Sequence, residues 1–323
     1  MKNYNIPIFI PHEGCPHDCV FCNQRKITGV QTSVTPNDGA IIIKEHLGYL
    51  PQGEKYVEVA FFGGSFTGLP LEIQEEFYKM SDEFRPDIQG IRLSTRPDYI
   101  NSEVLNLAKK YGVTMIELGA QSAVDEVLKK NNRGHAFNDT KEAVRLIKEA
   151  KIGVGLQMMV GMYGSSAESD LYTSKALAEL NPDCVRIYPV LVLRETGLEN
   201  LYNIGEYVPL SLEDAIVRAK NMALEFKKKN IPIIRLGLHA GEDLREEGTI
   251  AAGPFHPAIG ELVESRIWRD KIEEKIKSLD EIPREFEVEA PKSETSKIIG
   301  HKRCNAEYFK EKYGVEIKVM RNS

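Results

Sequence analysis

The chain opens with Ile6-Pro7-Ile8-Phe9-Ile10 and, shortly after, Gly14-Cys15-Pro16-His17-Asp18-Cys19-Val20-Phe21-Cys22. The apolar run predicts a strand, so the cysteines, spaced C-x3-C-x2-C, fall on the loop that leaves its C-terminal end. Short spacings, with a glycine and a proline among them, let a loop turn several sulfurs toward one point, which is how thiolates hold an iron–sulfur cluster. The sequence predicts that such a cluster binds to Cys15, Cys19 and Cys22.

A structural zinc site is the first alternative for these thiols. Such a site usually takes four protein ligands, often as two separated pairs. The other two cysteines, Cys184 and Cys304, are isolated and far along the chain. Three incidental thiols are a further alternative, but free cysteines are normally scattered and buried. Three ligands on a four-iron cluster would leave one iron open to a substrate or cofactor.

With Phe21 before the last cysteine, C-x3-C-x2-C after a first strand resembles the motif of the radical S-adenosylmethionine (SAM) enzymes. The resemblance implies a [4Fe–4S] cluster whose open iron binds the amino and carboxylate groups of SAM. It also implies that an electron, supplied by a donor such as ferredoxin or flavodoxin, splits SAM into methionine and a 5′-deoxyadenosyl radical.

Length and composition are those of a globular protein. The 323 residues, 42% hydrophobic and 28% charged, suffice for one large α/β domain and a small appendage. No apolar run reaches the length of a membrane span, and the N-terminus lacks a signal-peptide pattern, so no membrane partner is expected. Five cysteines, three of them clustered, argue against a disulfide framework and predict a cytoplasmic protein.

Strand-like and helical patterns alternate as far as about residue 240. The predicted strands are Ile6–Ile10, Val57–Phe62, Ile91–Thr95, Met115–Gly119, Val154–Val160, Val185–Val190 and Ile231–Leu236. The predicted helices are Asp38–Leu50, Leu71–Phe84, Ser102–Tyr111, Val124–Asn131, Asn138–Ala150, Glu168–Leu180 and Ser211–Asn230. Such alternation predicts a parallel sheet with helices outside. Six or seven units are too few for a closed barrel, so we expect an α/β incomplete (β/α)6–7 barrel of the radical SAM type. In barrel folds, sites gather at the C-terminal ends of strands.

We predict three segments. Residues 1–240 form the partial barrel, 241–282 are a linker with a long helix from about Ala258 to Ser278, and 283–323 form a small module.

Gly63-Gly64-Ser65 follows the second predicted strand. Glycines at a strand end let a ligand approach the backbone, although a Gly-Gly pair alone is more often a tight turn. One unit after the cysteine loop, the pair resembles the motif that contacts the amino group of SAM.

Gln121 follows the fourth strand, and Arg133 comes twelve residues later. This combination resembles oxygen-independent coproporphyrinogen oxidase, in which the matching residues contact SAM. A guanidinium suits the methionine carboxylate because it offers paired, charge-assisted donors; a solvated helix-end cation is the alternative. Gln157, on the fifth strand, stands where that family uses an Asp for the ribose, and a packed strand residue is equally consistent.

A closer resemblance, to the catalytic subunit of Elongator, covers residues 5–240. It is carried by the stretches Ser94–Tyr99, Asp183–Leu193 and Gly205–Pro209. It implies an RNA substrate such as tRNA. Ser94 replaces the Glu of that family, which puts one SAM contact in doubt. No stretch resembles the Elongator acetyltransferase domain, so carboxymethylation from acetyl-CoA is not expected of this chain alone.

Residues 283–323 read as a β-α-α-β module that resembles a KH domain, which binds single-stranded RNA through a Gly-x-x-Gly loop. Here the loop is Gly300-His301-Lys302-Arg303, without the second Gly, and Lys302 and Arg303 are the candidate RNA contacts. Lys292–Ser323 carries eight Lys or Arg against four Glu, which favours RNA. Packing on the barrel, or a dimer contact, is the alternative role.

The sequence therefore predicts a radical SAM enzyme that modifies RNA, tRNA in particular. Two alternatives stay open: the same chemistry on a small molecule or tetrapyrrole, and a non-catalytic iron–sulfur protein that binds RNA or serves as a scaffold.

Overall fold

The computed structural model describes residues 2–10, 15, 18–23, 34–238 and 248–321. Its core is a seven-stranded parallel sheet in the order β1-β2-β3-β4-β5-β6-β8. The strands are β1 (Lys2–Ile10), β2 (Lys55–Gly63), β3 (Gly90–Thr95), β4 (Val113–Gln121), β5 (Gly153–Val160), β6 (Cys184–Pro189) and β8 (Ile233–Leu236). All seven were predicted. Each lies beside the one before it, with β1 and β8 at the two edges, so the predicted incomplete barrel is confirmed.

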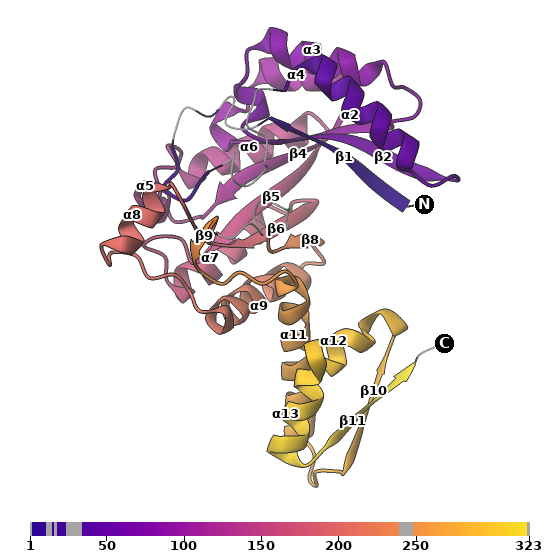
Figure 1. The fold of residues 1–323 in the computed structure, drawn as a ribbon, viewed down its shortest axis with the longest axis vertical. Helices are drawn as coiled ribbons and strands as arrows, with labels where there is room; N and C mark the ends of the chain where they lie inside the picture. The colour runs from indigo at the N-terminus through magenta and orange to yellow at the C-terminus, as the bar shows by residue number, and fades with distance from the viewer. Residues whose placement is uncertain (1, 11–14, 16–17, 24–33, 239–247, 322–323) are drawn as a thin grey trace.

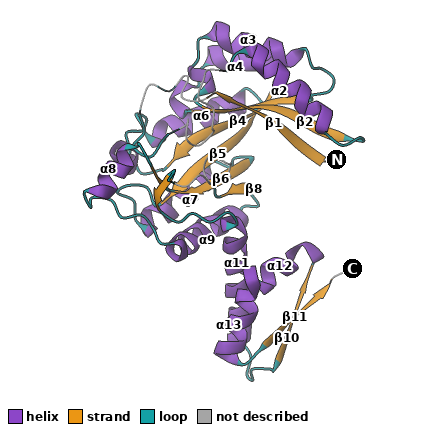
Figure 2. Ribbon diagram, viewed as in Figure 1, coloured by secondary structure: helices purple, strands orange, loops and turns teal. Residues whose placement is uncertain are grey.

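Helices cover one face of this sheet (Figures 1 and 2). They are α2 (Pro36–Tyr49), α3 (Leu71–Asp82), α4 (Ser102–Lys110), α6 (Phe137–Glu149), α7 (Ala167–Glu179) and α9 (Leu212–Lys228). The short helix α5 (Asp125–Lys130) lies at the strand ends instead, where Val127 packs with Val20 and Leu198. Several begin where the sequence supplies a cap: the side chains of Thr35, Asn101, Ser166 and Ser211 accept a backbone N–H of the first turn.

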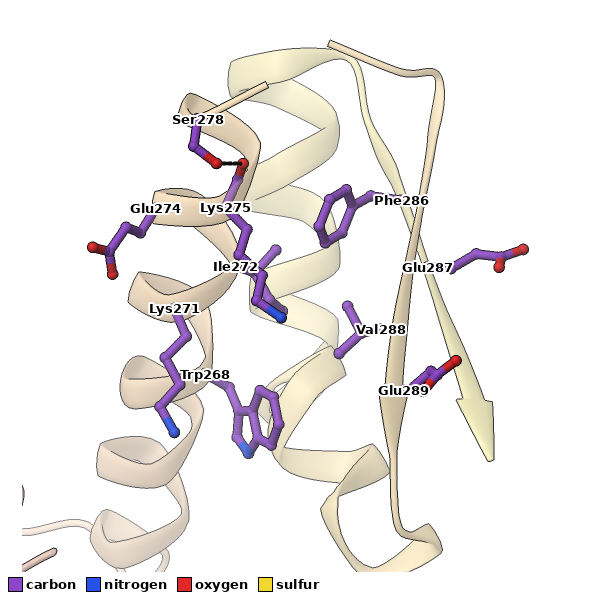
Figure 3. A pocket seen from close by; sticks show the side chains of 10 residues that line it. All are labelled: Trp268, Lys271, Ile272, Glu274, Lys275, Ser278, Phe286, Glu287, Val288 and Glu289. Atoms are coloured by element: carbon purple, nitrogen blue, oxygen red, sulfur yellow. Dashed lines mark hydrogen bonds between the residues drawn. The ribbon is translucent and has the colours of Figure 1, made fainter. Parts of the chain in front are cut away.

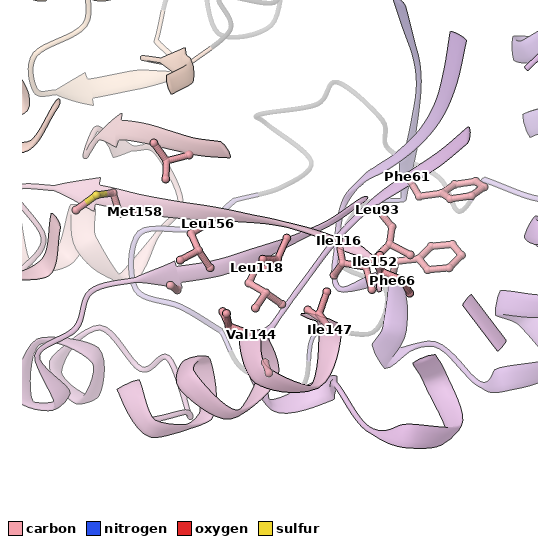
Figure 4. Packing of buried hydrophobic residues seen from close by; sticks show 14 of the residues in the cluster. Phe61, Phe66, Leu93, Ile116, Leu118, Val144, Ile147, Ile152, Leu156 and Met158 are labelled. Carbon is pink, nitrogen blue, oxygen red and sulfur yellow. The ribbon is translucent and has the colours of Figure 1, made fainter. Parts of the chain in front are cut away.

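The two faces of the sheet differ in chemistry because successive strand residues point to opposite sides. On β2, Val57, Val59 and Phe61 are buried, and Phe61 stacks on Phe66 with ring centroids 4.6 Å apart. Figure 4 shows the same apolar layer continuing between the strands and α6. The intervening positions, such as Glu58, line the inner face of the partial barrel.

Several short elements near the strand ends were not predicted. Helix α8 (Gly197–Asn203) follows a two-residue strand, β7 (Val192–Leu193), which pairs antiparallel with β9 (Ile250–Ala252). Such short elements carry too few residues to show a period. None of the helices within the described ranges is long and apolar enough to cross a membrane.

The C-terminal part follows the predicted β-α-α-β order. Helix α11 (Ile259–Lys277) leads to β10 (Glu285–Ala290), α12 (Thr295–Ile299), α13 (Cys304–Tyr313) and β11 (Glu316–Arg321). A 3-10 turn, η3 (Lys292–Glu294), directly precedes α12. Strands β10 and β11 pair in parallel, and the module lies at the far end of α11 from the barrel (Figure 1).

Helix α11 belongs to two hydrophobic cores. Val263 and Ile267 pack in the barrel core, whereas Ile272 and Ile276 pack with the two strands and two helices of the module. The division into three segments remains a prediction, and this helix is the part that both cores share.

Candidate functional site

The cysteine loop leaves β1 and is held by backbone contacts to distant segments. The Val20 N–H donates to the carbonyl of Asn131 at 3.3 Å, and the Leu198 N–H donates to the carbonyl of Val20 at 2.6 Å. The Asn132 side-chain amide donates to the carbonyl of Asp18 at 2.9 Å. These contacts hold Asp18 and Val20 between the end of α5 and the start of α8.

Arg133 joins this loop to the end of β4. Its Nη1 lies 3.1 Å from Cys19 Sγ, and its Nη2 donates to the Gly119 carbonyl at 2.7 Å. The residue is only 6% exposed, so the alternative of a solvated cation at a helix end is wrong. Arg133 therefore places a buried cation directly beside one of the three thiols.

Cys15 lies in the same surroundings. Burial, and then the neighbouring Cys19, raise the pKa of the Cys15 thiol, while the Arg96 and Arg133 guanidiniums and a backbone hydrogen bond from Ser65 oppose that rise. The Cys22 N–H donates to the Cys19 carbonyl at 3.0 Å. Thiolates are the usual ligands of an iron–sulfur cluster, and a guanidinium suits a carboxylate.

The described part of the structure does not bring the three sulfurs together at one point. Within the ranges that it describes, no three His, Cys, Asp or Glu side chains gather around one point. Loop residues 11–14 and 16–17 lie outside those ranges. The metal-binding role of Cys15, Cys19 and Cys22 therefore stays a prediction that the chemistry of their surroundings fits.

Gly63 and Gly64 lie at the end of β2, against the end of β1. Gly63 has φ +102°, and a Cβ there would lie 3.2 Å from the backbone nitrogen of Ile10. The Gly64 N–H donates to the Ile10 carbonyl at 2.6 Å. The backbone itself thus requires glycine at position 63, and a SAM contact remains a prediction.

Ser65 is used within the protein. Its hydroxyl lies 2.8 Å from Thr95 Oγ1 and accepts the Arg96 N–H at 3.1 Å. Arg96 in turn donates to both carboxylate oxygens of Asp98, at 3.0 and 2.8 Å, and to the carbonyl of Arg133. Arg96 was not among the predicted site residues, although an Arg and an Asp shortly after a barrel strand are a signal that could have identified it.

Gln121 ends β4, and Gln157 stands beside it within β5. Gln121 is buried and has a left-handed φ of 64°, and its Oε1 lies 3.4 Å from Gln157 Nε2. Gly119 keeps room for this group, because a Cβ there would lie 3.0 Å from Gln121 Nε2 and 3.4 Å from Arg133 Nη2. The structure therefore brings the predicted glutamines and Arg133 together beside the cysteine loop.

An ionic network that the sequence did not reveal lines the inner face just below. Glu117, which is 5% exposed, accepts from Arg92 Nη1 at 2.9 Å and also from Arg186. Arg92 further donates to Glu58 Oε2 at 2.9 Å. The network ties β2, β3, β4 and β6 together beneath the site.

Lys302 and Arg303 are not part of this site. They lie in the turn between α12 and α13, with left-handed φ values of 51° and 66°. His301, in the same turn, places its ring 5.5 Å from that of His256.

An open parallel barrel that presents a three-cysteine loop, a glycine pair and a buried arginine at its C-terminal strand ends defines an enzyme of the radical SAM type. The chain belongs to the radical SAM superfamily, whose model matches residues 9–172, and a Radical_SAM C-terminal domain matches residues 182–269.

Two curated proteins are similar to this chain in sequence. A "tRNA uridine(34) acetyltransferase" of Methanocaldococcus infernus is 33% identical over 50% of this chain and 34% of its own length. "Elongator complex protein 3" of Schizosaccharomyces pombe is 32% identical over 52% of this chain and 32% of its own length. The chain thus spans about a third of these curated relatives.

Solved structures confirm the fold. The archaeal Methanocaldococcus infernus Elp3 superposes with a TM-score of 0.65 and 25% identity, covering 83% of this chain and 63% of that one. Coproporphyrinogen III oxidase from Escherichia coli superposes with a TM-score of 0.51 and 18% identity, covering 71% of this chain and 52% of that one. Both predicted resemblances are confirmed at the level of the fold.

Proposed function

We propose that this chain holds a [4Fe–4S] cluster on Cys15, Cys19 and Cys22, cleaves SAM reductively, and modifies RNA, tRNA in particular. The observation that carries the proposal is the buried Arg133 guanidinium, which reaches Cys19 on one side and the end of β4 on the other. The names of the relatives support the RNA substrate.

A cluster held by Cys15, Cys19 and Cys22 would supply the one-electron reduction that splits SAM into methionine and a 5′-deoxyadenosyl radical. The protein's own residues would bind SAM and orient it. Arg133 offers charge-assisted donors for the methionine carboxylate. We assign the backbone at Gly63, Gly64 and Ser65 to the amino group of SAM, Gln121 to a further SAM contact, and Gln157 to the ribose.

Iron content and SAM cleavage test the enzyme. After anaerobic reconstitution with iron and sulfide, the protein should bind about four irons and form 5′-deoxyadenosine when reduced flavodoxin or ferredoxin is supplied. Cys15→Ala, Cys19→Ala and Cys22→Ala should each lose both properties, whereas Cys304→Ala, at an exposed cysteine outside the site, should keep them. Zinc in place of iron, or 5′-deoxyadenosine from the loop variants, would contradict the proposal. Iron without SAM cleavage would favour the non-catalytic alternative.

Arg133 is tested by SAM binding in the reconstituted protein. Arg133→Met removes the donors and should weaken SAM binding about tenfold or more, the equivalent of one lost charge-assisted bond. Arg145→Met is the matched control, because Arg145 is exposed on α6. Equal SAM affinity in both variants would remove Arg133 from the SAM site.

The RNA substrate is tested by comparing modified nucleosides. Transfer RNA from cells that lack the protein should lack one modified nucleoside, and the purified enzyme with SAM should restore it. An unchanged nucleoside profile, together with SAM cleavage stimulated by a small molecule or tetrapyrrole, would support the second enzymatic alternative.

A further inference from the structure

The sheet of the C-terminal module has an open edge beside helix α11. Strand β10 pairs with β11 on one side, and among the described residues no strand pairs with its other side. A groove of about 860 Å³ lies along that side, between β10 and α11. Its size is typical of a ligand site, and an unpaired strand edge is a ready acceptor for another strand.

Both walls of the groove carry apolar residues, and Lys271 and Lys275 of α11 also line it. Trp268 and Ile272 of α11 face Phe286 and Val288 of β10 across it (Figure 3). The indole is held in place, because Trp268 Nε1 donates to Glu294 Oε2 at 2.9 Å. A helix and a free strand edge with apolar side chains between them is the arrangement that binds an extended peptide as an added strand.

The outer face of the sheet is acidic. Glu285, Glu287 and Glu289 alternate with the groove residues along β10 and are exposed, and Figure 3 shows Glu287 and Glu289 pointing away from the groove. On β11, Glu316 stands opposite Glu285, and Lys318 stands opposite Glu287. Lys318 pairs with Glu285 at 2.6 Å, so this face has four acids and one lysine.

The negative charge of this face determines which strand could pair with the open edge of β10. Pairing of β10 with its copy in a second molecule would set glutamates beside glutamates, which destabilises a strand pair. RNA would meet the same row of carboxylates. A strand with lysine or arginine at its outward positions and apolar residues at its inward positions would satisfy both the acidic face and the apolar groove.

We propose that the groove between α11 and β10 is a docking site for an extended protein segment in which apolar and basic residues alternate. The segment adds to β10 as a third strand, and its apolar side chains enter the groove beside Trp268. This site is independent of SAM chemistry at the barrel.

The only tryptophan of the chain, Trp268, reports on occupancy directly. The probe is an acetylated, amidated octapeptide of four Val-Lys repeats, titrated into the full chain while tryptophan emission is recorded. We expect saturable quenching or a spectral shift. The matching Val-Glu peptide and an eight-nucleotide single-stranded RNA should cause none.

Two variants and a modified peptide distinguish strand addition from a general charge effect. Glu287→Lys with Glu289→Lys should weaken the Val-Lys peptide about tenfold, from two lost cross-strand pairs, and should admit the Val-Glu peptide. Glu45→Lys, at an exposed position on α2, is the control and should change neither. N-methylation of alternate amides that face β10 should abolish binding, whereas methylation of the intervening amides should not.

Several results would overturn the proposal. They are no emission change with the Val-Lys peptide, equal affinity for the Val-Glu peptide, a response to RNA in its place, or a dimer that dissociates when β10 is charge-reversed.

Discussion

Replacing Glu117 by Gln should destabilise the barrel by removing one buried charge from the network on its inner face. The change keeps the shape of the side chain, yet it leaves Arg92 and Arg186 without their shared carboxylate. The side chains of Glu117, Arg92 and Arg186 are 5%, 14% and 17% exposed, so water can replace little of what is lost.

The size of the effect follows from that burial. Breaking a buried ion pair costs about 3–5 kcal/mol. Arg92 retains Glu58, and Arg186 retains a contact to Tyr188 at 3.3 Å, so the lower figure, about 3 kcal/mol, applies. With an unfolding entropy of about 2 cal/mol/K per residue, this lowers the melting temperature by about 4 °C.

Thermal unfolding followed by circular dichroism measures this shift, with a matched control on the surface. Glu142→Gln breaks the pair with Arg145, in which both side chains are 52% exposed. It should change the melting temperature by less than about 1 °C, because exposed pairs contribute little.

A second change separates an orphaned cation from a general loss of packing. Adding Arg186→Met to Glu117→Gln should restore part of the stability, so the two effects should fall short of additive. If Glu117→Gln melts like Glu142→Gln, or if the double variant is strictly additive, the network does not stabilise the barrel as we reason.

Three further predictions follow. Gly63→Ala should lower the unfolding free energy by about 1–3 kcal/mol, because φ is +102° and a Cβ would lie 3.2 Å from the Ile10 backbone. The control, Gly48→Ala, is on an exposed turn of α2 with open space around it and should not destabilise the protein; chemical denaturation measures both variants. Hydrogen bonds from Lys110 and Tyr111 lower the pKa of Glu75 to about 2. The stabilisation from this carboxylate is therefore complete above its unfolded pKa of 4.5 and disappears as the pH falls from there toward 2. The melting temperature of Glu75→Gln should depend less on pH across that range, and an unchanged pH profile would contradict the assignment. In Lys302→Gln with Arg303→Gln, the negative slope of log tRNA affinity against log salt concentration should become shallower by about 0.7–0.9 per lost phosphate contact. An unchanged slope in filter binding would exclude the turn as an RNA contact.

The sequence predicted the barrel well because its strands are buried apolar runs. Val57–Phe62 and Val154–Val160 have enough β-branched and aromatic residues to be recognised from composition. The polar start of β1, Lys2–Asn5, was missed, since it becomes a strand only by pairing with Lys55–Glu58 of β2. Pairing partners of this kind are a tertiary property, which no local pattern contains.

The candidate site was predictable only where a motif names its residues. The cysteine loop, the glycine pair, Gln121 and Arg133 could be identified in this way, and the structure brings Gln121, Gln157 and Arg133 together. Arg96 was missed because its role depends on the carbonyl of Arg133, 37 residues away. Glu117, Arg92 and Arg186 come from three strands, and only their placement on a common inner face reveals the network.

Helix α11 fixes the spacing between the two ends of the molecule. Its 19 residues extend for about 28 Å at 1.5 Å per residue, and each half is embedded in a different core. An RNA bound by Lys302 and Arg303, as predicted, would have to span this helix to reach the barrel site as well. RNA fragments shorter than that span would contact one of the two sites but not both.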